Sequence, residues 1–129
     1  MEPSIAEGIR LFNAQRFFEA HEALEAVWLK AQGEEKCFLH GLIQIAAAFH
    51  HFTRGNLTGF RSLLEKGLAK LEKFGEKPQS GIDLTGFLEK LQPWREFAQQ
   101  PDGQEHSYHP RQPDSSTPAP FPHIPPAPA

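Results

Sequence analysis

Apolar residues recur every three or four positions through most of the first 98 residues, the spacing that places them along one side of an α-helix. Glycine, asparagine and proline interrupt this spacing at intervals and divide it into separate segments. We therefore predict an all-α domain over residues 1–98, a compact bundle of about five helices. The expected helices span about 3–15, 17–31, 34–54, 57–74 and 83–98.

Short sequence signals place the ends of these helices. Pro3 and Ser4 are suited to begin the first helix, because proline fits a first turn, where its missing N–H would be unpaired anyway. Asp83 is suited to cap the fifth helix. Asn13 is a candidate for a left-handed turn residue, and Gly33 should end the second helix. Pro93 lies inside the fifth helix and predicts a kink or a restart there.

The third predicted helix is apolar nearly all round, which is typical of a helix packed between others. One strip along it carries small or polar side chains instead, and the small alanines in that strip would let a neighbouring backbone or a ligand approach closely. The strip consists of Cys37, His40, Gln44, Ala47, Ala48 and His51.

The second predicted helix carries a histidine and carboxylates on or beside its apolar side. His21 lies just inside the edge of the apolar stripe, Glu25 lies beside it, and Glu22 lies at its outer margin. If the second and third helices form an antiparallel hairpin, their polar lines can meet in the core. The candidate cluster consists of His21, Glu22, Glu25, Trp28, His40, Gln44 and His51.

This cluster has two interpretations. It could be a buried polar network, with histidine, glutamine and indole donating to a carboxylate and fixing the register of the helices. It could instead bind a divalent metal or a small ligand, with His21, Glu25 and His51 as the metal ligands. Glutamine is a poor ligand for transition metals, and the sequence contains no Glu-x-x-His motif of the kind that bundle metal sites use.

Two other kinds of catalytic chemistry are disfavoured. The segment from His21 to Glu25 is similar to the zinc-protease motif His-Glu-x-x-His, but its last position is Glu, so the histidine pair that holds zinc is missing. Cys37 lies one turn from His40, yet its surroundings are apolar and no third group orients the pair, so we interpret it as a core cysteine.

Composition changes beyond the predicted bundle. Nine of the twelve prolines lie between residues 101 and 128, with few large apolar side chains around them. Such a segment buries too little apolar surface to offset the entropy of ordering it. We therefore predict that residues 99–129 form a disordered, proline-rich tail. The alternative is a peptide of polyproline II type that docks in an aromatic groove.

Charge and composition exclude several classes of protein. A formal net charge of −3 gives no basic surface for nucleic acid. The first residues lack the basic and apolar regions of a signal peptide, and the most apolar run, residues 37–52, is too short and too polar to cross a membrane. A single cysteine, Cys37, fits a reducing compartment, so we expect a cytoplasmic protein that binds neither nucleic acid nor membrane.

Several motifs resemble one small prokaryotic family. They are Phe-Glu-Ala-His-Glu over residues 18–22, Gly-Leu-Ile-Gln over 41–44 and Arg-Gly-Asn over 54–56. On these residues the chain resembles domain of unknown function 309 over about residues 5–75. The resemblance implies a compact all-helical domain and brings no established activity. The recurring positions of the family correspond to Glu19, His21, Glu22, Trp28, Gln44, Arg54, Gly55 and Asn56.

The sequence thus leads to one functional expectation with an alternative. We expect a non-catalytic binding or scaffold module with a buried His/Glu/Gln cluster between its second and third helices. The alternative is a metal- or small-ligand-binding enzyme that uses His21, Glu22, Glu25 and His51. The sequence leaves open whether the protein forms a homodimer or binds another protein. It does not identify a substrate, and the one cofactor it suggests is a divalent metal.

Overall fold

The structure is a computed structural model that describes residues 4–74, 81–99 and 121–126. Within these residues the chain forms α1 (Ile5–Asn13), α2 (Phe17–Trp28), α3 (Gly33–Thr53), α4 (Leu57–Glu72) and α5 (Leu84–Ala98). An isolated bridge between Ile82 and Pro126 is the only β-type pairing in this described part. The prediction of an all-α bundle of about five helices is confirmed.

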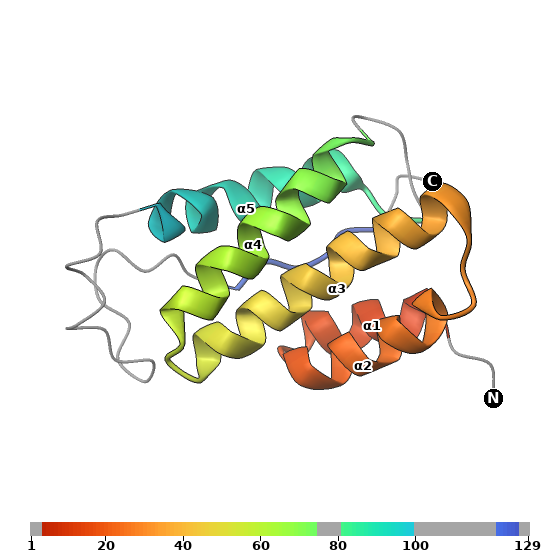
Figure 1. Cartoon of the computed structure of the whole chain (residues 1–129), viewed down its shortest axis with the longest axis horizontal. Coiled ribbons are helices and arrows are strands. Elements are labelled where there is room, and N and C mark those ends of the chain that lie inside the picture. Colours follow the sequence, from red (N-terminus) through yellow and green to blue (C-terminus); the bar gives the residue numbers. More distant parts are fainter. Residues whose placement is uncertain (1–3, 75–80, 100–120, 127–129) are drawn as a thin grey trace.

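The longest helix, α3, lies at the centre of the bundle. The α1–α2 hairpin packs on one side of α3, and α4 packs on the other (Figure 1). The remaining helix, α5, contacts α4. This central position explains why α3 is apolar nearly all round, since several neighbours cover it. None of the helices described is long and apolar enough to cross a bilayer.

Three side chains begin helices, and two of them, Ser4 and Asp83, were predicted from the sequence to do so. The Ser4 hydroxyl accepts a hydrogen bond from the backbone N–H of Glu7 at 3.2 Å, at the start of α1. Asn56 and Asp83 do the same for α4 and α5, with distances of 3.0 and 3.1 Å to the backbone nitrogens three residues later. These bonds pair N–H groups that a helix start would otherwise leave without a partner.

Two boundary predictions are wrong, and one of the two alternatives predicted at Pro93, a restart of the helix, does not occur. Helix α2 ends at Trp28, and Gly33, with φ +63°, begins α3 instead of ending α2. The left-handed turn residue after α1 is Gln15, with φ 65°, not Asn13. No restart occurs in α5, which continues through Pro93. Pro93 is exposed, so water can replace the helical hydrogen bond that its missing N–H cannot make.

The centre of the core is aromatic. Phe49 is completely buried, and its ring packs edge-on at 5.0–6.0 Å against four other rings. These rings come from distant parts of the chain and are Phe12, Phe60, Trp94 and Phe121. Edge-to-face contacts of this kind stabilise a core beyond the burial of apolar area alone.

The end of the proline-rich segment belongs to this core. Residues 121–126 run along the bundle (Figure 1), and Pro122 and Ile124 are buried. The prediction of a disordered tail is therefore wrong for 121–126. Composition suggested too little apolar surface, but Ile124 lies in the core and Phe121 packs against it. The tail residues 100–120 and 127–129 lie outside the described residues.

Candidate functional site

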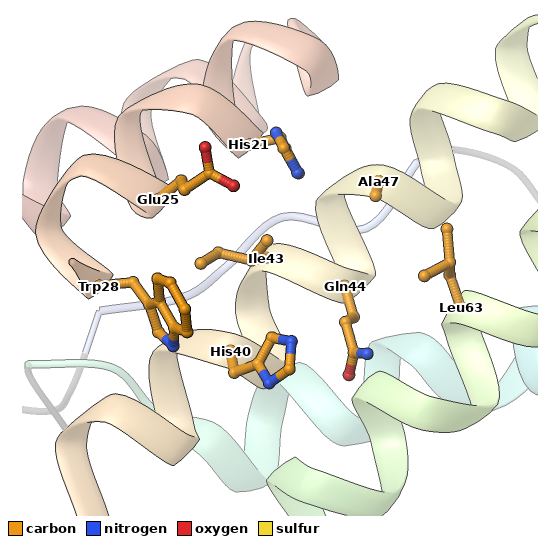
Figure 2. A pocket seen from close by; sticks show the side chains of 8 residues that line it. All are labelled: His21, Glu25, Trp28, His40, Ile43, Gln44, Ala47 and Leu63. Atoms are coloured by element: carbon orange, nitrogen blue, oxygen red, sulfur yellow. The ribbon is translucent and has the colours of Figure 1, made fainter. Parts of the chain in front are cut away.

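An open pocket lies between α2 and α3, with one residue of α4 at its edge (Figure 2). Its volume is about 240 Å³. It combines a carboxylate, two imidazoles, a carboxamide and an indole with an apolar lining. The lining residues are His21, Glu25, Trp28, His40, Ile43, Gln44, Ala47 and Leu63.

Helical spacing explains why these side chains share the pocket. His21, Glu25 and Trp28 are four and three residues apart, so they point to the same side of α2. His40, Gln44 and Ala47 repeat this spacing on α3. Helices α2 and α4 both pack on α3 and leave this side of it uncovered between them. The middle of the predicted strip on α3, namely His40, Gln44 and Ala47, therefore forms one wall of the pocket.

The cluster is not buried as predicted. Glu22 and Glu25 are exposed, and His21, His40 and Gln44 are half-buried. No polar or charged residue is fully buried in the part of the chain that the structure describes. Apolar side chains such as Ala20 and Leu24 fill the seam itself, so the carboxylates stay at its margin and avoid the cost of losing their hydration.

His51 does not line the pocket with the other predicted residues. Its Nδ1 lies 3.1 Å from Nδ2 of Asn56, near the turn into α4. Helices α2 and α3 form an antiparallel hairpin, and the ring contacts of Trp28 with His40 and of Phe18 with His50 place Glu25 about level with residues 43 and 44. His51 lies seven residues further along α3, about 10 Å away, because a helix rises about 1.5 Å per residue. Glu25 and His51 therefore do not face each other.

The neighbouring histidine, His50, lies nearer to α2. Its ring is 5.2 Å from the ring of Phe18, which also stacks on His21 at 6.3 Å. Within the described ranges, no three His, Cys, Asp or Glu side chains are grouped closely enough to hold a metal ion. The proposed ligand set of His21, Glu25 and His51 is therefore not assembled in the structure.

Two lysines that the sequence analysis did not identify adjoin the pocket. Lys70 of α4 donates a hydrogen bond to Oε1 of Gln44 at 2.9 Å. The ammonium of Lys36 lies 4.4 Å from the centre of the Trp28 ring, in a cation–π contact. Helical spacing alone could not place either lysine, because it does not show which neighbour an exposed side chain meets.

The two pocket imidazoles differ in their surroundings. Burial and, secondarily, the Lys70 ammonium lower the pKa of His40, since both disfavour the imidazolium. The ring of His40 also lies 5.8 Å from the Trp28 ring. In His21, Nδ1 is buried and has no hydrogen-bond partner in the described part of the chain. His40 thus adds no positive charge to the pocket at neutral pH.

The lowered pKa of His40 predicts a loss of stability in acid. In the unfolded chain His40 takes up a proton near its ordinary pKa of about 6.5, whereas the folded state resists protonation. The contribution of the neutral His40 to the free energy of unfolding is therefore complete above about pH 6.5. It is lost as the pH falls through the lower pKa that His40 has in the folded state. Denaturant unfolding of the native chain and of His40→Gln from pH 8 to pH 5 should show a smaller decline for the variant.

His123 provides a control for this measurement, because it is exposed. His123→Gln should leave the pH dependence of the native chain unchanged. Equal slopes for the native chain and His40→Gln would contradict the assignment of the acid sensitivity to His40. His50 has a similarly lowered pKa, owing first to burial and then to neighbouring cations, and accounts for part of the remaining decline.

Comparison with known proteins gives a family match but no activity. Residues 5–63 match the family model described as "Domain of unknown function (DUF309)". An uncharacterized protein of Aquifex aeolicus (strain VF5) is 31% identical over an alignment of 96 residues, and the alignment covers 70% of this chain and 28% of that protein. The chain therefore spans little more than a quarter of that relative.

The matched residues include the whole lining of the pocket, from His21 to Leu63, whereas Lys70 and residues 121–126 lie beyond them. The pocket is thus a feature of the part of the chain that carries the family pattern. The resemblance inferred from the motifs is confirmed: residues 5–63 match the family of domain of unknown function 309.

Proposed function

We propose that this protein is a non-catalytic binding module whose pocket receives a cationic side chain of a protein partner. The arrangement of Glu25 and Trp28 supports this function most directly. A carboxylate on the pocket rim and an indole ring beside it are the two groups that bind guanidinium and ammonium ions in proteins. The Trp28 ring already holds one ammonium, that of Lys36.

His40 and the apolar lining of the pocket are compatible with such a guest. His40 is neutral at pH 7 because its pKa is lowered, so it does not repel a cation. Ile43, Ala47 and Leu63 offer apolar surface to the hydrocarbon stem of a lysine or arginine. The exposure of Glu25 keeps its carboxylate accessible.

The alternative of a metal-dependent enzyme has less support. It requires three or more ligands around one ion, and the described residues bring no such group together. Elemental analysis of tag-free protein separates the two functions, because stoichiometric bound metal would favour the enzyme.

Substituting Glu25 tests the proposed binding. N-acetyl-arginine amide should bind the native chain at millimolar concentration and shift the NMR signal of the Trp28 indole. Glu25→Gln should weaken this binding about threefold to fivefold, the contribution of a partly exposed ion pair. The melting temperature should stay nearly constant, because Glu25 is exposed.

Glu22→Gln is the matched control, because Glu22 is an exposed acid on the same helix that does not line the pocket. This variant should bind the arginine amide like the native chain. An equal loss in both variants would indicate nonspecific attraction to an acidic helix. Preferential binding of N-acetyl-glutamate amide would exclude a cationic guest.

A further inference from the structure

The last described segment of the chain, residues 121–126, sits on the bundle in the manner of a bound peptide. It contacts helices from both halves of the sequence, namely α1, α2 and α3 in the first half and α5 in the second. We define the tail-binding surface as the side chains and backbone groups that hold it, namely Asn13, Phe17, Phe49, Phe52, Asp83 and Trp94.

One side chain of this surface recognises peptide backbone. The carboxamide of Asn13 accepts a hydrogen bond from the Ile124 N–H at 2.7 Å and donates one to the Ile124 carbonyl at 3.2 Å. The backbone N–H of Asp83 donates to the Pro125 carbonyl at 2.9 Å. These three bonds select an extended backbone, as in the addition of a peptide strand to an exposed edge.

Two side chains of the segment supply its anchors. The Phe121 ring stacks on Trp94 at 5.3 Å with an angle of 6° between the ring planes, and it meets Phe17 edge-on at 5.3 Å. Ile124 is only 2% exposed. His123, which lies between these anchors, is exposed. The surface thus contacts a Phe and an Ile three positions apart and makes no use of the side chain before Ile, which is exposed.

The prolines of the segment suit it to this role. Pro122, Pro125 and Pro126 have no N–H to leave unpaired, and Asn13 takes the N–H of Ile124. Proline also restricts the unbound peptide to extended conformations, so little entropy is lost on docking. The backbone N–H and carbonyl groups that the segment presents therefore match the hydrogen-bonding groups of the surface.

From these contacts we propose that the tail-binding surface is a peptide-recognition site for extended, proline-flanked Phe-Pro-x-Ile segments. The chain's own residues 121–126 are its resident ligand. A segment of the same chemistry in another protein would have to displace them. A tethered ligand of this kind has an effective concentration on the order of millimolar. It therefore competes with peptide segments of other proteins and lowers their apparent affinity for the surface.

A variant with a weakened tail tests this site in the full chain. Phe121→Ala combined with Ile124→Ala removes both anchors and leaves the surface intact. A fluorescent peptide with the sequence of residues 117–129 should bind this variant at least about tenfold more tightly than the native chain, whose tail competes. Fluorescence anisotropy measures the two affinities, and a peptide carrying the same two alanines is the control for specificity.

Adding Asn13→Ala to the weakened variant tests the backbone clamp. Loss of its two hydrogen bonds should weaken binding of the peptide by a further factor of about ten. Asn56→Ala, which removes an asparagine that caps α4 and does not belong to the tail-binding surface, is the matched control and should leave the affinity unchanged. A folded weakened variant that does not bind the peptide would overturn the proposal.

If the weakened variant fails to fold, a second measurement tests the proposal. In this case, restoration of its circular dichroism by the peptide supports the site. In parallel, a protease site inserted within residues 104–112 of the otherwise native chain allows the tail to be cut from the folded protein. Exchange of the cut fragment for labelled peptide supports the proposal. A fragment that leaves only when the whole domain unfolds shows that residues 121–126 are merely core.

Discussion

Phe49→Ala is expected to lower the free energy of unfolding by about 3–5 kcal/mol, the range for truncating a fully buried phenylalanine. Phe49 is 0% exposed and packs against rings from four other segments of the chain. The resulting cavity lies where the helices and residues 121–126 converge, so no single element can move to fill it. Urea unfolding followed by circular dichroism measures the loss.

Phe18→Ala is the matched control, because Phe18 is the same residue type but 51% exposed. Its removal should cost less than about 1 kcal/mol, since surface substitutions change stability little. Similar losses in the two variants would contradict the position of Phe49 at the centre of the core. A urea unfolding midpoint of Phe49→Ala equal to that of the native chain would also contradict this position.

Gly67→Val is expected to lower the free energy of unfolding by at least about 2 kcal/mol, in the upper part of the range for overpacked sites. A Cβ at Gly67 would lie 2.8 Å from Cδ1 of Ile45 and 2.9 Å from the carbonyl oxygen of Gly41. The isoleucine can change rotamer, but a backbone oxygen of α3 cannot move without its helix. The substitution must therefore separate α3 from α4. The same urea titration measures this effect.

Ala69→Val on the exposed side of α4 is the control for a valine in this helix that meets no neighbouring helix. It should cost less than about 1 kcal/mol, the whole span of ordinary helix propensities. A Gly67→Val variant as stable as Ala69→Val would show that α3 and α4 do not approach closely at this position.

Gly67→Val should also alter the candidate pocket. Lys70, which bonds to Gln44, lies one turn after Gly67 on α4. Moving α4 away from α3 should break this bond and withdraw the ammonium that helps to lower the pKa of His40. In Gly67→Val the pKa of His40 should therefore rise towards its ordinary value. Titration of the His40 ring by NMR detects this change.

The pocket and the tail-binding surface are independent in their tests. Glu25→Gln acts on a carboxylate between α2 and α3, whereas Asn13→Ala acts on a carboxamide at the end of α1. The two sites share no residue. Failure of arginine amide to bind would remove the proposed function and leave the peptide site untouched, and the reverse also holds.

Much of the fold could be predicted from the sequence because helices are local. Ser4, Asn56 and Asp83 each bond to a backbone nitrogen three residues away, so their role can be recognised within one turn. The pocket walls follow the same logic. The spacing of His21, Glu25 and Trp28 places them on one side of α2 whatever packs against it.

What the sequence could not provide is the match between segments distant in the chain. Helical spacing aligned His51 with His40 and Gln44, but only the register of the hairpin showed that His51 lies beyond the level of Glu25. Burial of Glu25 was wrongly predicted for a related reason. Whether a side chain at the edge of an apolar stripe is covered depends on the neighbouring helix and not on its own.

The sequence by itself determined the five helices, most of their starts and the sides on which the polar residues lie, because capping and periodicity act over a few residues. The tertiary structure alone decided that the pocket is open and that Lys70 adjoins it. It also decided that Ile124 binds Asn13 across 111 residues of chain. Such contacts depend on the shapes of whole surfaces, which no short stretch of sequence specifies.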